Sequence, residues 1–347
     1  MKQPLVTIIT PTFNHEGYIA ECIDSVLAQG YPEWEQIVVD DGSTDRTAEI
    51  VRSYSDPRIH YIRLQHRGLG SLSETYNTAL ARARGTLVAV LEGDDRWPAG
   101  KLERQVPLFD DPSVFLSWGR ARLIDRDGAP RGERVSVVTR QATRSFTNRE
   151  VFQRLATVNL LTPTVTVVVR RDALEAAGGF QQSGSTLFVD LPTWLAVSAR
   201  AEGVAVYLNA VVGCYRVHGE QTSSRFVHRM ESEHLQVVLE QAARLEPRVL
   251  AALGWEDGVR RRAVVGGLLA AGRGHLHTRR FGSAAGSFGR ALARSRSLPE
   301  AGKSVIGLLS TVVRRDLLGS AYASRERAVS LVGRSAAESG PEVPEPS

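Results

Sequence analysis

The sequence predicts an α/β protein with a mostly parallel central sheet, helices on its faces and an α-helical C-terminal extension. Three observations lead to this prediction. Strand-like and helix-like segments alternate four times at the start of the chain, joined by short links. The strand that ends this series is short and apolar throughout, as expected of a strand buried on both faces. From residue 228 onward the apolar spacing is helical.

Size and composition are those of an ordinary soluble protein. A chain of 347 residues accommodates one large domain with an appendage, or two domains. Cys22 and Cys214 lie far apart within apolar patterns, which favours buried free thiols and a reducing compartment. The first residues lack the apolar segment of a signal peptide, and no run approaches the roughly 18 apolar residues of a spanning helix. We therefore expect a cytoplasmic protein, either free or at the inner face of the membrane.

Turn residues and changes of apolar spacing bound the predicted elements. In chain order these are strands at 5–10, 36–39, 59–64 and 87–91, with helices at 18–27, around 48–51 and at 73–83. The strands at 5–10, 36–39 and 87–91 run into Pro11-Thr12-Phe13-Asn14, Asp40-Asp41-Gly42-Ser43 and Glu92-Gly93-Asp94-Asp95. Short strands from 115 to 138, a strand at 165–169, a helix from Asp190, and strands at 204–208 and 211–217 follow.

Five acidic side chains end two of these strands. Asp40 and Asp41 follow the second strand, and Glu92, Asp94 and Asp95 follow the fourth. The carboxyl ends of parallel strands lie along one edge of a sheet, so we expect the two clusters to meet there. Carboxylates packed this closely repel one another unless a cation compensates, and Mg²⁺ or Mn²⁺ would also bind phosphate oxygens. The alternative is a pair of solvated acidic turns that cap helices.

Three further polar residues stand out in the second half of the chain. Asp190 follows an apolar run and begins a helix, where a carboxylate is commonly a simple N-cap. Arg216 and His218 lie two residues apart in an extended segment, so both side chains point to the same face. There they could contact anionic oxygens.

The C-terminal third carries the basic surplus. From Val259 to Arg334 there are fifteen Lys and Arg residues against Glu300, Asp316 and Glu326. The segment 305–318 is basic and amphipathic, which is typical either of a helix packed on the domain or of one that contacts a membrane surface or an anionic acceptor. We expect no nucleic-acid partner, because few aromatic residues are interleaved with the basic ones.

Several other functions are excluded by motifs that are incomplete. Gly68-Leu69-Gly70 lacks the third glycine of a dinucleotide-binding loop and follows the third strand rather than the first. Neither a Walker motif nor Cys/His spacing suited to zinc occurs. A nucleotidyltransferase would need a glycine-rich, Lys-bearing loop directly after the first strand, and the segment 11–14 supplies neither feature.

Eight stretches in the right order carry a resemblance to a known family. They are 6–14, 38–45, Asn77 with Gly85, 91–95, 98–103, Gly178-Gly179-Phe180, Asp190 with Trp194, and Tyr215-Arg216-Val217-His218. Over roughly residues 4–225 the chain resembles the family 2 glycosyltransferases, inverting enzymes with the GT-A fold that use nucleotide-sugar donors. The resemblance implies a GT-A domain at 1–225, with a nucleotide-sugar half at about 1–110 and an acceptor half at about 111–225. A helical region at 226–334 and a disordered tail at 335–347 would follow.

The resemblance also implies a role for each matching residue. The nucleotide-sugar site would be formed by Pro11, Phe13, Asn14, Asp41, Asn77, Glu92, Asp94, Arg216 and His218. Of these, Pro11, Phe13 and Asp41 would hold the nucleoside. Asp94 and Asp95 would bind Mn²⁺ or Mg²⁺, with a UDP-sugar as the expected donor. Asp190 would be the catalytic base that takes a proton from an acceptor hydroxyl.

Three positions depart from the family pattern. Glu92 stands where the family usually has Asp, Val189 stands where many relatives carry an acid, and Pro192-Thr193 replaces a frequent Asp-Leu pair. We expect the acceptor to be a glycan, a lipid-linked molecule or a small molecule, and the basic C-terminal helices to allow a peripheral membrane contact. The competing hypothesis is a catalytically silent nucleotide-sugar-binding or scaffold protein of the same fold.

Overall fold

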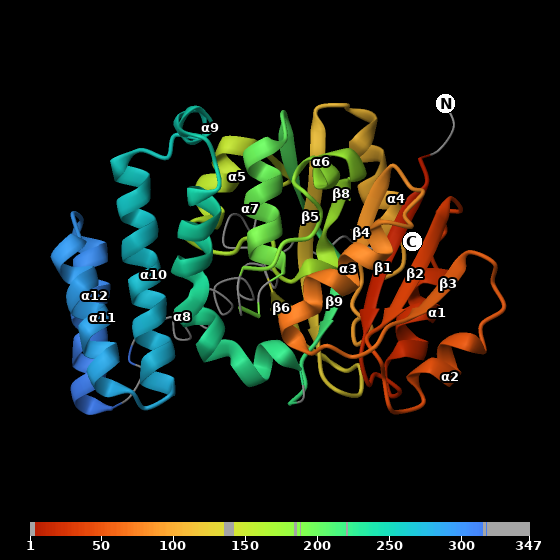
Figure 1. Ribbon diagram of the computed structural model, residues 1–347, viewed down its shortest axis with the longest axis horizontal. Helices are drawn as coiled ribbons and strands as arrows, with labels where there is room; N and C mark the ends of the chain where they lie inside the picture. Colours follow the sequence, from red (N-terminus) through yellow and green to blue (C-terminus); the bar gives the residue numbers. More distant parts are fainter. Residues whose placement is uncertain are drawn as a thin grey trace, which may run out of the picture.

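A single mixed sheet forms the centre of the protein. The computed structural model describes residues 4–134, 142–183, 186–187, 189–219, 221–314 and 317. Within them the sheet has nine strands in the order β3-β2-β1-β4-β8-β5-β9-β7, with β6 paired to β5 (Figure 1). The strands are β1 (Val6–Thr12), β2 (Trp34–Asp40), β3 (Ile59–Arg63), β4 (Leu87–Val90), β5 (Val114–Ile124), β6 (Pro130–Arg134), β7 (Arg144–Thr147), β8 (Val168–Arg170) and β9 (Val204–Arg216).

Helices lie on both faces of the sheet and continue beyond it. They are α1 (Ile19–Leu27), α2 (Thr47–Arg52), α3 (Leu72–Leu80), α4 (Lys101–Gln105), α5 (Asn148–Leu155), α6 (Arg171–Ala176), α7 (Asp190–Arg200), α8 (Thr222–Ala243), α9 (Pro247–Ala252), α10 (Asp257–His277), α11 (Phe281–Arg294) and α12 (Leu298–Val313). Short 3₁₀ turns occur at Leu69–Ser71, Val106–Asp110 and Thr164–Thr166. The predicted α/β class is confirmed.

The first four strands form the predicted parallel unit. β1 pairs in parallel with β2 on one side and β4 on the other, and β2 pairs in parallel with β3. Side chains alternate between the two faces, as the pleat requires. In β1, Ile8 packs in the cluster with α1 and α2, whereas Ile9 packs in the cluster with α3 and α7. Burial on both faces explains why these strands read as continuous apolar runs.

The second half of the sheet differs from the prediction in two places. The strand predicted at 165–169 begins only at Val168, because residues Thr164–Thr166 form a 3₁₀ turn, and it pairs antiparallel with both β4 and β5. The two strands predicted at 204–208 and 211–217 are one bent strand, β9. Its pairing with β5 shifts register beside Gly119, whose missing side chain lets the Leu208 carbonyl approach; a Cβ there would lie 2.8 Å from that oxygen.

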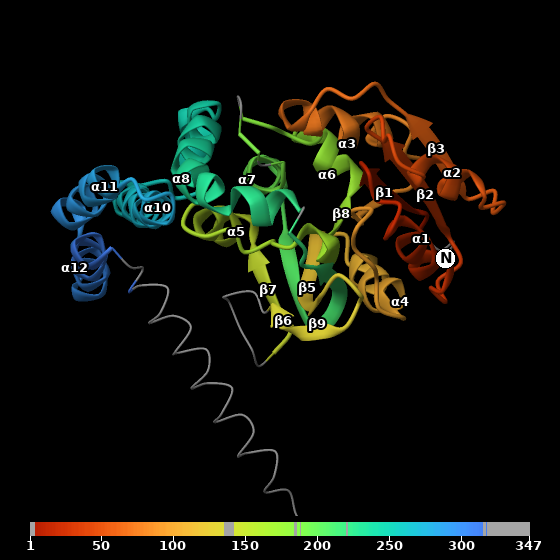
Figure 2. The same cartoon turned by 90° about the horizontal axis from the view of Figure 1, so that it is seen from below.

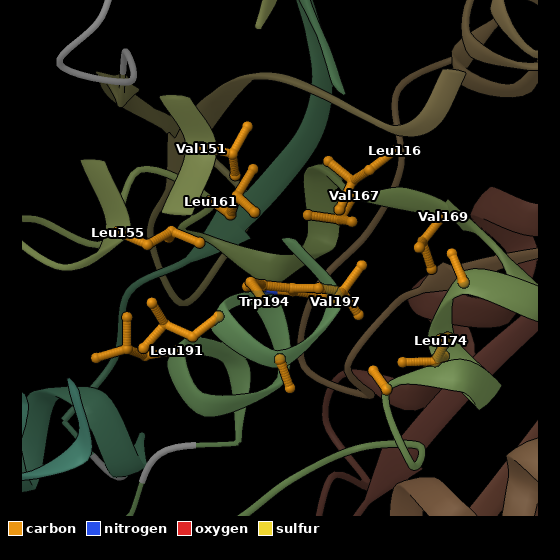
Figure 3. Close-up of a cluster of buried hydrophobic side chains, with 14 of the residues drawn as sticks. Leu116, Val151, Leu155, Leu161, Val167, Val169, Leu174, Leu191, Trp194 and Val197 are labelled. Atoms are coloured by element: carbon orange, nitrogen blue, oxygen red, sulfur yellow. The ribbon is translucent and has the colours of Figure 1, made fainter. Parts of the chain in front are cut away.

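Helix α7 is held in the larger hydrophobic cluster. Leu191, Trp194 and Val197 point toward side chains of α5 and the neighbouring strands (Figure 3). All three are fully buried. This packing fixes the start of α7, and therefore Asp190, relative to the sheet.

The C-terminal helices form a successive array. α8 packs on α7, α10 on α8, and α11 on α10, while α12 packs on α11 and also contacts α10, so that α11 and α12 lie together at one end of the molecule (Figures 1 and 2). The helical pattern predicted from residue 228 is confirmed through Val313, while the predicted tail at 335–347 lies outside the described residues. None of the described helices is both long and apolar enough to cross a membrane. The two cysteines are free and buried, as predicted.

Candidate active site

The three loops that follow β1, β2 and β4 meet at one edge of the sheet. The backbone amide of Asp41 donates to the carbonyl of Thr12 at 2.9 Å, and that of Gly93 donates to the carbonyl of Pro11 at 3.0 Å. A Cβ on Gly93 would lie 2.6 Å from Oγ1 of Thr12, so this close approach requires glycine. The predicted convergence of the two acidic clusters is confirmed.

An aromatic and acidic surface lies beside this edge. The rings of Phe13 and His66 stack with centroids 4.2 Å apart and planes 11° apart. Nδ1 of His66 lies 2.8 Å from a carboxylate oxygen of Asp41. Phe13 is 37% exposed. A planar ring beside a fixed carboxylate is a suitable surface for a nucleobase that offers an N–H group.

Asn14 joins the loops after β1 and β2. Its Oδ1 accepts from the backbone amide of Thr44 at 2.8 Å, and its backbone amide donates to Oγ of Ser43 at 2.9 Å. Its φ of 54° is in the left-handed region, which Asn tolerates better than most residues. Asp40, by contrast, is buried and accepts from the hydroxyl of Tyr61 at 2.5 Å and the amide of Ser43 at 2.7 Å. Asp40 therefore shapes the loop rather than facing the edge.

Asp94 and His218 form a buried pair across the sheet edge. Oδ2 of Asp94 lies 3.1 Å from Nε2 of His218, although the two residues are 124 positions apart. Burial acts to raise the pKa of Asp94, but His15 and His218 outweigh it, so the pKa lies below its ordinary value. Tyr18 covers the His218 ring, with centroids 5.0 Å apart. The pair presents one carboxylate and one imidazole at the same point.

Asp95 is bonded to the end of β9. Its Oδ1 accepts from the backbone amide of Arg216 at 2.7 Å. Burial raises the pKa of Asp95 well above its ordinary value, and the nearby charges of Asp94 and Glu92 add to this effect. Asp95 is 1% exposed. A carboxylate enclosed in this way contributes mainly to the structure of the turn.

Arg216 reaches the acidic turn but is enclosed by the protein. Its Nε donates to the Asp94 carbonyl at 2.7 Å, and Nη1 donates to the carbonyls of Asp125 and Arg126 at 3.1 and 2.9 Å. Nη2 forms an ion pair with Glu21 of α1. Arg216 and His218 thus both contact Asp94, in agreement with the shared face that their spacing predicts. The donor contact that the resemblance implies for Arg216 stays a prediction, since its guanidinium already binds these groups.

Glu92 is the first acidic residue of the turn after β4 and contacts Tyr76 of α3. Its Oε1 accepts from the hydroxyl of Tyr76 at 3.1 Å, while the buried Oε2 has no hydrogen-bond partner among the described residues. The pKa of Glu92 is raised to about 7, mainly by burial and in part by the charges of Asp94 and Asp190. The influence of both aspartates on Glu92 places it near the two acidic positions at once.

Asp190 is the first residue of α7 and is oriented by another side chain. Nδ2 of Asn159 donates to its Oδ2 at 2.5 Å. Val189 occupies the N-cap position of α7 and Asp190 is the first helical residue, so Asp190 is not the N-cap residue itself. The half-buried carboxylate lies at a helix N-terminus, where the helix dipole favours its ionised form.

Asn77 is engaged with the backbone of Phe180. Its Nδ2 donates to the Phe180 carbonyl and its Oδ1 accepts from the Phe180 amide, both at 2.8 Å. The resemblance counted Asn77 among the nucleotide-sugar residues. In the structure it connects α3 to the segment after α6, and the donor contact stays a prediction.

Sequence reasoning did not identify four residues that complete the site. They are Tyr18, Glu21, His66 and Asn159. Tyr18 and Glu21 lie on or beside an amphipathic helix, where they look like ordinary partly exposed positions. His66 and Asn159 lie in loops without a motif. Each acquires its role from a residue distant in the chain, so no local signal marks it.

Comparisons with known proteins identify the family of the chain. The sequence profile described as "Glycosyl transferase family 2" matches residues 7–177. The chain is 34% identical over 225 residues to the putative teichuronic acid biosynthesis glycosyltransferase TuaG of Bacillus subtilis, covering 64% of this chain and 82% of that protein. It is 36% identical over 127 residues to the UDP-Glc:alpha-D-GlcNAc-diphosphoundecaprenol beta-1,3-glucosyltransferase WfgD of Escherichia coli, covering 37% of this chain and 49% of that protein.

Two solved structures show the fold. S. aureus TarS 1-349 in complex with UDP-GlcNAc aligns with a TM-score of 0.57 at 18% identity, covering 90% of this chain and 92% of that one. The mannosyltransferase PcManGT from Pyrobaculum calidifontis, in complex with GDP-Man and Mn²⁺, aligns with a TM-score of 0.55 at 20% identity, covering 91% and 88%. The fold is therefore of the GT-A type. From its identity to TuaG over most of that protein, together with the profile match, the chain belongs to glycosyltransferase family 2 and is a glycosyltransferase.

Proposed function

We propose that the protein is a metal-dependent inverting glycosyltransferase that moves a sugar from a UDP-sugar to an acceptor hydroxyl in glycan biosynthesis. One observation carries the proposal. The Asp94–His218 pair lies at the sheet edge with the Phe13–Asp41 surface, and Glu92 lies within electrostatic reach of both Asp94 and Asp190. On this proposal, the pair would face the phosphates, the ring and carboxylate would bind the base, and Asp190 would supply the carboxylate that takes the acceptor proton.

The side chains at the acidic turn suit a divalent cation that is also coordinated by the diphosphate of the sugar donor. No group of three His, Cys, Asp or Glu side chains in the described ranges is arranged to hold a metal alone. The resemblance implies Asp94 and Asp95 as metal ligands, but Asp95 is enclosed and accepts from the Arg216 amide. Asp94 and His218 would therefore supply an oxygen and an imidazole nitrogen, and phosphate oxygens and water would complete the coordination of Mn²⁺ or Mg²⁺. A bound cation would stabilise charge that develops on the departing diphosphate. PcManGT, named with Mn²⁺ and GDP-Man, supports this reading.

The residues of this chain supply the remaining steps. Phe13 would lie against the base, and the Asp41 carboxylate would accept its N–H group. Asp190, oriented by Asn159, would take the proton of the acceptor hydroxyl as that oxygen attacks the anomeric carbon. Attack from the face opposite the diphosphate inverts that carbon. The enclosed Arg216 would act as a positioning residue that holds the Asp94–Asp95 turn.

The names of the relatives support a proposal for the chemical class of the sugar donor and of the acceptor. UDP-sugars are named for WfgD and for the TarS complex, which supports a UDP-sugar here. WfgD is named for a diphosphoundecaprenol-linked acceptor, which supports a lipid-linked acceptor and a cytoplasmic enzyme at the inner face of the membrane. We place donor binding at about 1–110 and acceptor binding at about 111–225, where Asn159 and Asp190 lie. Of the helical region predicted at 226–334, the described helices extend to Val313.

A donor-hydrolysis screen tests the proposal. Purified protein with Mn²⁺ or Mg²⁺ and a panel of UDP-, GDP- and dTDP-sugars should release nucleotide from one donor. Asp94→Asn should abolish release and donor binding, whereas Asp190→Asn should retain donor binding and lose transfer. Asp110→Asn, at an exposed position, is the matched control.

Two outcomes would contradict the proposal. Metal-dependent donor binding without turnover, with every acceptor tried, would favour the silent binding protein. Absence of binding to any nucleotide sugar in calorimetry would show that the sheet edge is not a donor site.

A further inference from the structure

Helix α12 packs on the array with its small residues and turns its large apolar residues outward. Ser304, Gly307 and Ser310 are buried. A Cβ on Gly307 would lie 2.3 Å from the Phe288 ring of α11, so the two helices touch through the glycine. A helix of a water-soluble protein normally does the reverse and buries its large aliphatic side chains. The orientation of α12 is therefore the feature that needs an explanation.

The outward face forms one continuous apolar stripe. Its exposed members are Leu298, Val305, Ile306, Leu309, Val312 and Val313. Leu309 is 53% exposed and Val312 is 78% exposed. Their spacing of three, four and seven residues places them on one side of the helix. The segment 304–313 contains no charged residue that would interrupt the stripe.

The charge of the surrounding array indicates what this stripe contacts. Residues 257–314 contain eleven Lys and Arg residues against Asp257 and Glu300, and Glu300 is paired with Arg261 at 2.7 Å. The first 256 residues instead contain 31 acidic against 28 basic residues. A second copy of the chain would bring a second, equally basic array against the first, which like-charge repulsion opposes. An anionic surface is complementary to it.

We propose that the outward face of α12 docks on an anionic membrane surface. The 16-residue helix is about 24 Å long and would lie in the headgroup region with its apolar stripe against the acyl chains. The basic residues of the array would contact lipid phosphates around it. Figures 1 and 2 show α12 at the end of the molecule opposite α2 and β3, so docking there leaves the first half of the sheet uncovered. This inference is independent of the proposed reaction.

Vesicle flotation of the full chain tests the docking surface. Wild-type protein should float with phosphatidylglycerol-containing vesicles and remain unbound with pure phosphatidylcholine. Leu309→Glu combined with Val312→Glu should weaken binding at least about tenfold, because both apolar contacts are replaced by charge. Leu309→Gln combined with Val312→Thr should show a smaller loss in the same direction. This double variant without added charge keeps the test possible if the double glutamate variant does not fold.

Leu239→Glu is the matched control. Leu239 is an exposed leucine on α8, 38% accessible, so its replacement changes net charge without touching the stripe. It should float like the wild type. Equal losses in the control and the α12 variants, or no flotation of the wild type, would overturn the proposal. So would a wild-type dimer that the α12 variants convert to monomer with unchanged flotation, which would identify a second copy as the occupant. Flotation needs no sugar transfer, so its outcome is separate from that of the donor screen.

Discussion

The backbone amide of Arg216 donates to Oδ1 of Asp95 at 2.7 Å, which bonds the end of β9 directly to the acidic turn after β4. The Arg216 guanidinium is 1% exposed and spans from the Asp94 carbonyl to Glu21 of α1. Glu21 also pairs with Arg96, the residue that follows Asp95. One carboxylate thus holds two arginines on either side of the turn that carries Asp94.

Glu21→Gln should weaken metal-dependent donor binding and lower kcat/KM by about tenfold to a hundredfold. The amide leaves the buried Arg216 cation without its counter-charge, which is costly even though the Glu21 side chain is 39% exposed. The expected loss corresponds to about 1.4–3 kcal/mol. Metal titration together with donor kinetics measures it.

Glu16→Gln is the control for that experiment. Glu16 pairs with Arg46 at 3.3 Å, but both side chains are largely exposed, and exposed pairs contribute little. It should leave metal affinity and kcat/KM within about twofold of wild type. Equal effects of the two variants would show that Glu21 has no special role in holding the turn.

Asp41→Asn should reduce the preference for uridine over cytidine nucleotides. Uracil offers an N3–H group to a carboxylate and cytosine does not, so UDP affinity should fall by roughly tenfold while CDP affinity changes little. Competition of UDP and CDP against a bound donor measures this. His66→Ala should weaken both nucleotides by a smaller factor, because it removes the ring stacked on Phe13. A uniform loss in Asp41→Asn would assign Asp41 to loop structure instead.

Asn159→Ala should lower kcat for transfer about tenfold and leave the KM for the donor unchanged. The variant removes the amide that donates to Asp190 at 2.5 Å, so the carboxylate loses its fixed orientation toward the acceptor. Thr157→Ala, a nearby and exposed residue, should behave like the wild type. A rise in donor KM without a change in kcat would place Asn159 in donor binding.

The free energy of unfolding should fall as the pH drops from about 6.5 toward 4, because His234 is protonated in the unfolded chain but not in the folded one. Burial lowers the pKa of His234 on α8 to about 4, although hydrogen bonds with the backbone of Ala156 and Leu155 act to raise it. The unfolded chain binds this proton near pH 6.5 and the folded chain does not. The contribution of neutral His234 to the free energy of unfolding is therefore fully present above pH 6.5. It is lost as the pH falls toward 4, and this loss is at most about 3 kcal/mol. Urea unfolding at pH 7.5 and 5 should show that His234→Leu has a smaller pH dependence than the wild type.

Gly307→Ala should destabilise the C-terminal array by about 1–3 kcal/mol, because the added methyl overlaps the buried Phe288 ring. Gly302→Ala, on the same helix, meets no atom within 4 Å and should stabilise α12 by up to about 1 kcal/mol through helix propensity. Hydrogen exchange of the α12 amides measures both effects: it should be faster in Gly307→Ala and slower in Gly302→Ala than in the wild type. If Gly307→Ala were also stabilising, α12 would not pack through this face.

Local signals in the sequence determined the parallel half of the sheet and its ligand edge. Strand-ending turns place Asp41 and Asp94 at the carboxyl ends of parallel strands, and this geometry does not depend on the rest of the chain. The family motifs added Asp190. The strand at 165–169 was misplaced because a β-branched apolar run has the same composition whether it forms a 3₁₀ turn or a strand.

Only the tertiary structure decided which partners these residues have. His218 meets Asp94 across 124 residues, and the orientation of Arg216 depends on Glu21 and two distant carbonyls. In α12 the sequence shows which residues share a face, but the contact between Gly307 and Phe288 decides that the apolar face turns outward. Periodicity and turn chemistry act over a few residues, whereas the choice of buried face and hydrogen-bond partner is set by packing between segments far apart in the chain.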